Sequence, residues 1–245
     1  MTKFLVSLLA VLQFSYATDY PLPSFNSTLE DISEKGITSE EIFNQLDRSF
    51  IKLSSSICAN RAMLWLWQMQ REMKVQGAKA FIFYTPKKNG TTGSKNWWYH
   101  VTPVVNENGN LIAVDRGFSR KIKSAVPLET WFEKFAGNKV CREIKPDDHD
   151  LIKRMFVRRT FPINYKGEEN DCYYIVAPAG YWIPSSVAMH LLGKDSKGEP
   201  VHFVRDEMRV GEVKKSCREA VNKKVGKWLG LGRKKCKKLI GKEYY

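Results

Sequence analysis

A single residue, Cys58, stands where the local structure can turn a cysteine thiol into a nucleophile. A run of serines precedes it, and residues 59–76 have the pattern of one helix that Gly77 can close. With Ser55 or Ser56 as the N-cap, Cys58 lies in the first helical turn. The unpaired N–H groups and the positive end of the helix dipole there favour the thiolate. A thiolate is the nucleophile of cysteine enzymes, whereas a lone cysteine is more often a small core residue.

The chain after Gly77 has the pattern of β-strands. Asn108-Gly109 is the strongest hairpin signal in the sequence, because a two-residue turn favours this pair. Pro103, in the strand before this turn, cannot donate a ladder hydrogen bond, so we expect that strand at a sheet edge or at a bulge. The expected strands span residues 80–85, 97–105 and 111–115.

The predicted turn fixes which side chains of the hairpin share a face. It pairs Glu107 with Asn110, and counting back along both strands makes His100 and Asp115 diagonal neighbours. Thr102 joins them, so this face is expected to be polar. The opposite face is expected to pack on the core, because it collects Tyr99, Val101, Val105, Ile112 and Val114.

A cysteine at a helix N-terminus beside a histidine and an aspartate forms a nucleophile, a base and an orienting group. In this hypothesis His100 takes the thiol proton and later gives it to a leaving amine, while Asp115 fixes the imidazole tautomer. Amides at the helix start, including that of Cys58, can stabilise an oxyanion. Taken singly, His100 could be a core histidine and Asp115 a strand-end cap. Their order and spacing favour catalysis.

The sequence around these residues resembles the bacterial protein-glutaminase (protein-glutamine deamidase) family. The resemblance covers about residues 55–135, although Arg116 stands where much of the family has proline. It is carried by Cys58-Ala59-Asn60-Arg61-Ala62, by Trp97-Trp98-Tyr99-His100-Val101, and by Ile112-Ala113-Val114-Asp115 followed by Trp131.

The resemblance implies an α+β fold with a papain/transglutaminase-like core, in which the nucleophile helix packs on an antiparallel sheet. It carries Cys58, His100 and Asp115 over as the catalytic triad, and Trp98 and Tyr99 are the expected substrate-binding residues. The implied reaction is attack on a glutamine side-chain amide of a protein, loss of ammonia and hydrolysis of the thioester to leave glutamate. It needs neither a metal nor an organic cofactor.

Two other functions fit the same residues. A transglutaminase or a cysteine peptidase would use the same triad. In a transglutaminase an amine resolves the acyl-enzyme, and in a peptidase the acyl-enzyme forms from a main-chain amide. An exported binding protein with a vestigial triad would instead use a basic C-terminus to hold an anionic partner.

The first residues have the features of a secretory signal peptide. Lys3 precedes a short apolar run, and Ser15-Tyr16-Ala17 offers small residues before a cleavage site near Ala17. We therefore expect a secreted or periplasmic protein with no transmembrane segment in the mature chain. The expected organisation is a signal peptide over 1–17, a protein-glutaminase-like catalytic domain over 18–200, and a basic, helical C-terminal extension over 201–245.

The cysteine count agrees with an oxidising compartment. Five cysteines leave one unpaired, and Cys58 is the expected free thiol. The other four can pair in three ways, of which we favour the two local loops, Cys141–Cys172 and Cys217–Cys236. A metal site is a poor alternative, because the sequence has no Cys-x-x-Cys or Cys/His cluster.

Positive charge is concentrated near the C-terminus. Residues 201–245 contain fourteen Lys/Arg and five Asp/Glu, a formal +9 of the chain's +14. Such a segment is attracted to anionic surfaces, although a solvated basic face would have the same composition. The sequence has no recognised nucleic-acid-binding fold, so specific nucleic-acid binding is not expected.

Overall fold

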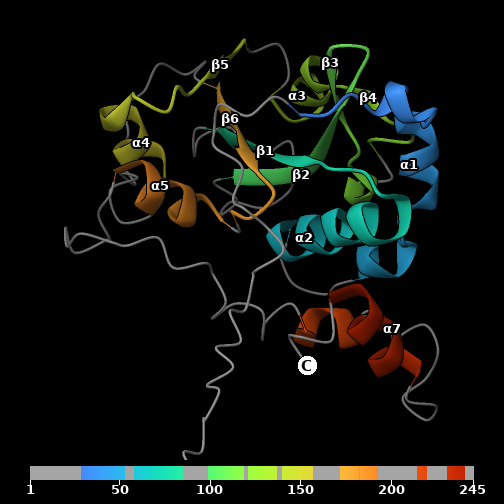
Figure 1. Cartoon of the computed structure of the whole chain (residues 1–245). Coiled ribbons are helices and arrows are strands. Elements are labelled where there is room, and N and C mark those ends of the chain that lie inside the picture. Colours follow the sequence, from blue (N-terminus) through green and yellow to red (C-terminus); the bar gives the residue numbers. More distant parts are fainter. Residues whose placement is uncertain are drawn as a thin grey trace, which may run out of the picture.

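The computed structural model is a mixed α+β fold with its helices packed around one sheet (Figure 1). It describes residues 29–52, 58–84, 99–118, 121–136, 140–156, 172–181, 183–192, 214–219 and 231–240. The N-terminal part contains η1 (Ile32–Lys35), α1 (Ser39–Gln45), η2 (Arg48–Lys52), α2 (Cys58–Gln68) and η3 (Met69–Met73). Further helices are η5 (Arg116–Phe118), α3 (Leu128–Ala136), α4 (His149–Phe156), α5 (Pro184–Leu192) and α7 (Leu231–Ile240), and residues 214–219 are also helical.

The sheet has six strands in the order β4-β3-β2-β1-β6-β5. Strand β1 is central and runs antiparallel to both β2 and β6. Strand β5 runs parallel to β6, so the sheet is mixed rather than wholly antiparallel as expected. The strands are β1 (Ala78–Tyr84), β2 (Tyr99–Glu107), β3 (Asn110–Ala113), β4 (Val126–Pro127), β5 (Cys141–Glu143) and β6 (Cys172–Pro178).

The β2–β3 hairpin has the predicted register, with Glu107 opposite Asn110. Asn108 and Gly109 both have left-handed backbones, at φ 52° and 77°, as this kind of tight turn requires. The Asp31 carboxylate accepts the N–H groups of both turn residues, at 3.0 and 3.1 Å. Hydrogen bonds, first from the side chain and backbone of Ser33 and then from the turn, lower the pKa of Asp31 to about 2.

Pro103 does not mark a sheet edge, because β2 lies between β1 and β3 in an unbroken register. The Pro103 carbonyl accepts the N–H of Val114 at 3.0 Å. A strand residue directs its nitrogen and carbonyl to the same neighbour, and the β2–β3 ladder ends at Ala113. The N–H that Pro103 lacks would therefore point to a position just beyond the β2–β3 ladder, where β3 offers no ladder partner for it.

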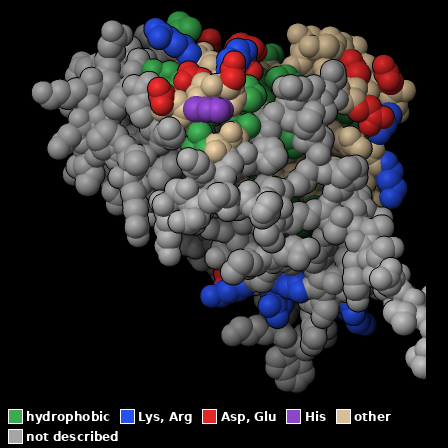
Figure 2. Space-filling model, turned by 60° about the vertical axis from the view of Figure 1, so that its left-hand side comes forward, with side chains coloured by type: hydrophobic (Ala, Val, Ile, Leu, Met, Phe, Trp, Pro, Cys, Tyr) green, Lys and Arg blue, Asp and Glu red, His purple; other side chains and the backbone are tan. Residues whose placement is uncertain are grey.

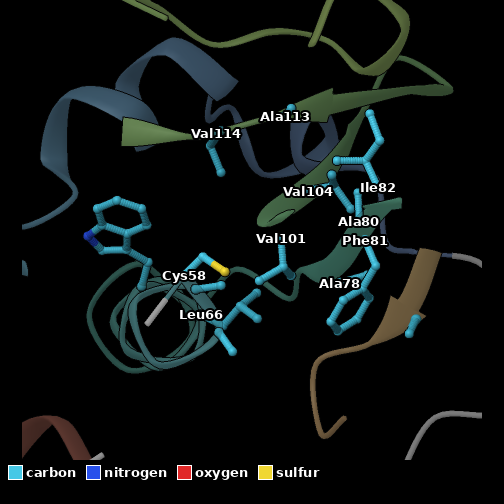
Figure 3. Close-up of a cluster of buried hydrophobic side chains, with 14 of the residues drawn as sticks. Cys58, Leu66, Ala78, Ala80, Phe81, Ile82, Val101, Val104, Ala113 and Val114 are labelled. Atoms are coloured by element: carbon cyan, nitrogen blue, oxygen red, sulfur yellow. The ribbon is translucent and has the colours of Figure 1, made fainter. Parts of the chain in front are cut away.

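Helix α2 is the central helix of the fold and is buried on nearly all sides. Cys58 and Leu66 on this helix face Val101 and Phe81 of the sheet (Figure 3). The helix ends earlier than expected: a π-helical turn follows Gln68, and Lys74 then takes a left-handed φ of 58°.

Gly77 therefore does not close this helix. A Cβ at Gly77 would come within 2.8 Å of the Leu66 side chain and 3.0 Å of the Val104 carbonyl oxygen. The residue is a glycine because the chain entering β1 passes very close to both α2 and β2.

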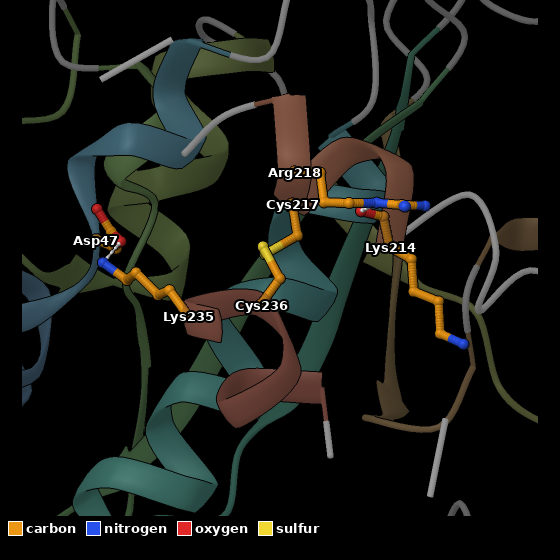
Figure 4. Close-up of a disulfide and its surroundings, with 6 residues drawn as sticks. All are labelled: Asp47, Lys214, Cys217, Arg218, Lys235 and Cys236. Atoms are coloured by element: carbon orange, nitrogen blue, oxygen red, sulfur yellow. Dashed lines mark hydrogen bonds and ion pairs between the residues drawn. A yellow bond between two sulfur atoms is a disulfide. The ribbon is translucent and has the colours of Figure 1, made fainter. Parts of the chain in front are cut away.

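The described parts of the C-terminal region pack on α2, on its side away from the sheet (Figure 1). Near the start of α2, the Asn60 amide donates to the Ser216 hydroxyl at 2.9 Å. Near the other end, Arg71 donates to the carbonyl of Ile240 at 3.1 Å. Lys235 also forms an ion pair with Asp47, beside the Cys217–Cys236 bond (Figure 4).

Both predicted disulfides are confirmed. Cys141 and Cys172 are bonded across the parallel β5–β6 pair, where they stand opposite each other in register. Cys217 is bonded to Cys236, joining residues 214–219 to α7. Cys58 is the free cysteine, as expected.

We predict that replacing both Cys217 and Cys236 with alanine lowers the free energy of unfolding by about 3 kcal/mol. The bond closes a loop with a sequence separation of 19, and a closed loop of this size restricts the unfolded chain by about that much. Urea unfolding of wild type and the double variant measures the difference. A reducing agent should abolish the difference, because it opens the Cys217–Cys236 bond of wild type as well. Equal stability of the two proteins without a reducing agent would contradict the prediction.

Candidate active site

The candidate nucleophile, Cys58, begins α2 as predicted. Its side chain is only 2% exposed and packs in the core cluster with Val101 and Val114 (Figure 3). The expected N-cap, Ser55 or Ser56, lies outside the described residues. Its position at the first residue of α2 puts it near the backbone N–H groups that a helix start leaves without intrahelical partners.

His100 and Asp115 are brought together by the β2–β3 hairpin. His100 is near the start of β2, and Asp115 follows the end of β3. The His100 Nε2 atom lies 2.7 Å from Oδ2 of Asp115, and both side chains are buried. The diagonal relationship predicted from the turn therefore produces a direct hydrogen-bonded pair.

Burial alone would disfavour charge on both members of this pair. Desolvation is the largest influence on His100 and lowers its pKa, but the charge and hydrogen bond of Asp115, with smaller contributions from Cys58, raise the pKa above its ordinary value. Desolvation likewise pushes the Asp115 pKa up, but the charge and hydrogen bond of His100 reverse this and hold the pKa low. The pair is therefore suited to holding an imidazolium next to a carboxylate.

The Cys58 side chain is among the groups that raise the pKa of His100, so the thiol lies within reach of the imidazole. Since Asp115 engages Nε2 of the imidazole, the other ring nitrogen, Nδ1, is the one that can face the thiol. The three residues therefore have the order in space that a nucleophile, a base and an orienting group would need.

Two further hydrogen bonds hold the Asp115 carboxylate. The Gly117 N–H donates to Oδ1 at 3.0 Å, and the Trp131 indole N–H donates to Oδ2 at 3.0 Å. Arg61 adds a favourable positive charge. Sequence reasoning included Trp131 and Arg61 only as letters of the family pattern and gave them no role. The position of Arg61, one helical turn after Cys58, is the signal that could have placed it near the site.

The sheet face that carries His100 is not the polar face expected from the sequence. His100 and Thr102 are buried, and aromatic rings enclose the imidazole. Phe118 meets it edge-on at 4.6 Å, Phe135 lies at 4.7 Å, and Trp131 stacks at 5.5 Å between ring centroids. Helix α3 thus supplies a second apolar layer that alternation along one hairpin could not reveal.

Arg116, where the family pattern has proline, anchors the loop after Asp115. Its guanidinium donates to the carbonyls of Phe43, Asn44 and Leu46 at the end of α1, at 2.7 Å for the first and last. These are the carbonyl groups that a helix terminus leaves without intrahelical partners. The departure from the pattern therefore ties Asp115 to α1.

Gly117 lets the same loop approach α2. A Cβ on Gly117 would come within 2.7 Å of the Arg61 Nε atom, so only glycine leaves room for the guanidinium. That guanidinium lies over the rings of Trp65 and Phe118, at 5.7 and 6.0 Å from their centroids. The helix that begins with Cys58 is thereby held against the loop that carries Asp115.

Of the two expected substrate-binding residues, the structure describes only one. Trp98 lies outside the described residues. Tyr99 is half-buried, and alternation along β2 puts it on the face opposite His100, where its ring is 6.2 Å from that of Phe81.

In the described part of the chain, no three side chains of His, Cys, Asp and Glu gather as a metal site would need. Among the same residues, no helix is both long and apolar enough to span a membrane.

Comparison with known families identifies the segment that contains this arrangement. Residues 36–135 match the model of a family described as Glutaminase. This match confirms the resemblance predicted from the motifs, and the matched stretch includes Cys58, His100, Asp115 and Trp131.

A solved structure is also similar to this chain, the NMR structure of protein-glutaminase from Chryseobacterium proteolyticum. The two share 12% sequence identity, and the match covers 71% of this chain and 80% of that one with a TM-score of 0.34. No curated protein matches the chain. The geometry of the site and the family match, rather than this weak overall overlap, carry the functional conclusions.

We predict that Asp115→Asn lowers the pKa of His100 from above its ordinary value to below it. The variant loses the charge that offsets burial, so desolvation becomes the dominant influence. An NMR titration of the histidine ring signals measures the change, with the exposed His149 as an internal reference. A His100 pKa that stayed raised in Asp115→Asn would show that the carboxylate does not support the imidazolium.

Proposed function

We propose that this protein is a secreted protein-glutamine deamidase with a papain/transglutaminase-like core. The family match supports an amide hydrolase of the glutaminase type. The observation that carries the proposal is the buried 2.7 Å contact of His100 with Asp115, with Cys58 near enough to raise the pKa of His100, inside the matched segment. Cys58, His100 and Asp115 are the proposed catalytic residues.

The proposed reaction begins with transfer of the Cys58 thiol proton to His100. The thiolate attacks the side-chain amide carbon of a glutamine, forming a C–S bond and an oxyanion. Collapse of this intermediate breaks the C–N bond, and His100 returns the proton so that ammonia leaves. A thioester joins Cys58 to the former glutamine side chain.

Water completes the cycle. His100, neutral again, takes a proton from water as the oxygen attacks the thioester carbon. The C–S bond breaks, the thiolate of Cys58 is regenerated, and the substrate side chain is released as glutamate. No electrons are transferred, so the reaction needs no redox cofactor.

The surrounding groups have defined roles in this scheme. Asp115 orients the imidazole and supports its positive charge, as the third member of a triad does. Backbone N–H groups at the start of α2, including that of Cys58, are the proposed donors to the oxyanion. Trp98 and Tyr99 remain the proposed substrate-binding residues.

The same acyl-enzyme permits two other outcomes. An amine in place of water would give transglutaminase products, and attack on a main-chain amide would make the protein a cysteine peptidase. We favour deamidation because the matched family is described as Glutaminase.

Two disulfides support a location outside the reducing cytosol. We infer that residues 1–17, which lie outside the described residues, form a signal peptide cleaved near Ala17. The proposed product is a secreted or periplasmic protein with a catalytic domain over 18–200 and a basic extension over 201–245.

Helix α7 favours a second role, binding of an anionic partner. Cys236, Leu239 and Ile240 are its buried side chains, whereas its exposed side chains include Lys234, Lys235, Lys237 and Lys238. Lys and Arg side chains gather at the lower end of the molecule in Figure 2, the end at which Figure 1 places α7. This role could accompany catalysis, or replace it in a protein with a vestigial triad.

We predict that the wild-type protein releases ammonia from casein and that Cys58→Ala reduces the rate at least about a thousandfold, because the nucleophile is lost. Each converted site should gain about 1 Da in intact-mass spectra, since an amide becomes an acid. Cross-linked products would indicate a transglutaminase, and new chain ends without ammonia a peptidase. If wild type yields none of these products and Cys58 fails to react with iodoacetamide, the catalytic proposal is wrong.

We predict that reversing Lys234, Lys237 and Lys238 to glutamate weakens binding to anionic lipid vesicles more than about tenfold. The matched control reverses three exposed lysines elsewhere, Lys121, Lys123 and Lys134, and so has the same net charge. Co-sedimentation at several salt concentrations measures both variants. Equal losses would mean that net charge, and not the exposed face of α7, attracts the vesicles.

A further inference from the structure

One oxygen of Asp115 receives hydrogen bonds from two different elements. His100 Nε2, from β2, lies 2.7 Å from Oδ2, and Trp131 Nε1, from α3, lies 3.0 Å from the same atom. Trp131 is fully buried, so water does not compete for its indole N–H. The other oxygen, Oδ1, accepts the N–H of Gly117 at 3.0 Å.

The chemistry of the Trp131 donor limits where protons can reside. An indole N–H donates a hydrogen bond and cannot accept one, and the backbone N–H of Gly117 is equally a donor only. With both oxygens of Asp115 facing such donors, a proton on the carboxyl group would displace one of them. The proton shared by Asp115 and His100 is therefore favoured on Nε2 of the imidazole. Nδ1 is then left free of a proton of its own and can take one from Cys58.

We propose that Trp131 is a positioning residue, which holds Asp115 as an acceptor and so fixes the tautomer of His100 that can deprotonate Cys58. The inference rests on the triad of the proposed function. In this role Trp131 acts through Asp115 and not on the substrate.

Trp131 also packs on the imidazole, and that contact must be separated from the hydrogen bond. Its ring stacks on His100 at 5.5 Å and touches Phe135 and Phe132 of α3 at 5.1 and 5.7 Å. A phenylalanine at position 131 preserves a stacking ring and removes the N–H. Phe132→Leu is a matched control, because it removes another buried ring of α3, one that packs on Tyr174 at 4.4 Å, without removing a donor to Asp115.

The other charged or titratable groups near Asp115 also affect any pH-dependent readout. They are His100 from β2, Cys58 and Arg61 from α2 and, next in the chain, Arg116, whose guanidinium is directed at the carbonyls of α1. None of them changes in Trp131→Phe, so a shift in that variant reports on the lost indole N–H.

The first readouts need no substrate. At a pH above the pKa of His100, where the ring is neutral, nitrogen NMR should show one tautomer in wild type and a mixture in Trp131→Phe. Iodoacetamide should alkylate Cys58 about tenfold more slowly at neutral pH in that variant, and the rate should rise at higher pH than in wild type. Phe132→Leu should match wild type in both. The proposal is overturned if Trp131→Phe behaves like wild type, or if both variants change equally.

Kinetics provides a third readout. The kcat for ammonia release should fall about ten- to a hundredfold in Trp131→Phe with KM nearly unchanged, since the group acts on the base and not on substrate binding. If Trp131→Phe does not fold, site-specific insertion of benzothienylalanine at position 131 replaces only the N–H by sulfur and permits the same measurements. Wild type that shows the NMR and alkylation behaviour but releases no ammonia would refute the deamidase and leave the role of Trp131 standing.

Discussion

A carboxylate cannot remain ionised in a dry protein interior unless the protein supplies hydrogen-bond donors and positive charge, and Asp115 is such a carboxylate. It is 1% exposed, yet its pKa stays low. Its donors come from β2, from α3 and from its own loop, while Arg61 on α2 adds positive charge. Each of these elements adds to the stability of the buried charge, because losing one donor leaves the carboxylate with fewer groups to offset its desolvation. The burial of this one group therefore links the positions of the sheet and of both helices that cover the site.

The short loop 115–118 is where these constraints meet. Asp115 faces His100, Arg116 binds the end of α1, and Gly117 packs against the Arg61 guanidinium. Phe118 then places its ring edge against the imidazole. These four consecutive residues thus contact β2, α1 and α2. A loop held at every residue gives the orienting group of a triad the fixed geometry that proton transfer needs.

Local sequence patterns predicted the features that depend on residues close together in the chain. The Asn108-Gly109 turn and the two-residue period of strands were enough to place His100 beside Asp115. The odd cysteine count left one thiol unpaired, and the predicted helix start singled out Cys58. Contacts between distant elements were not predictable in the same way. The pattern of β2 and β3 holds no information on α3, so neither the burial of the supposed polar face nor the donor role of Trp131 could be derived from it. The end of α2 was misplaced because Gly77 has a steric reason to be glycine that only the path of β1 reveals.

The packing of the C-terminal region on α2 affects the order in which the site can be assembled. The contacts Asn60–Ser216 and Arg71–Ile240 join residues 156 and 169 positions apart. The central strand β1 likewise needs β6, which follows it by about ninety residues along the chain. A growing polypeptide therefore contains Cys58 long before the partners that complete its helix exist. Contacts this long in sequence form late, so a fully packed nucleophile helix is a property of the finished chain.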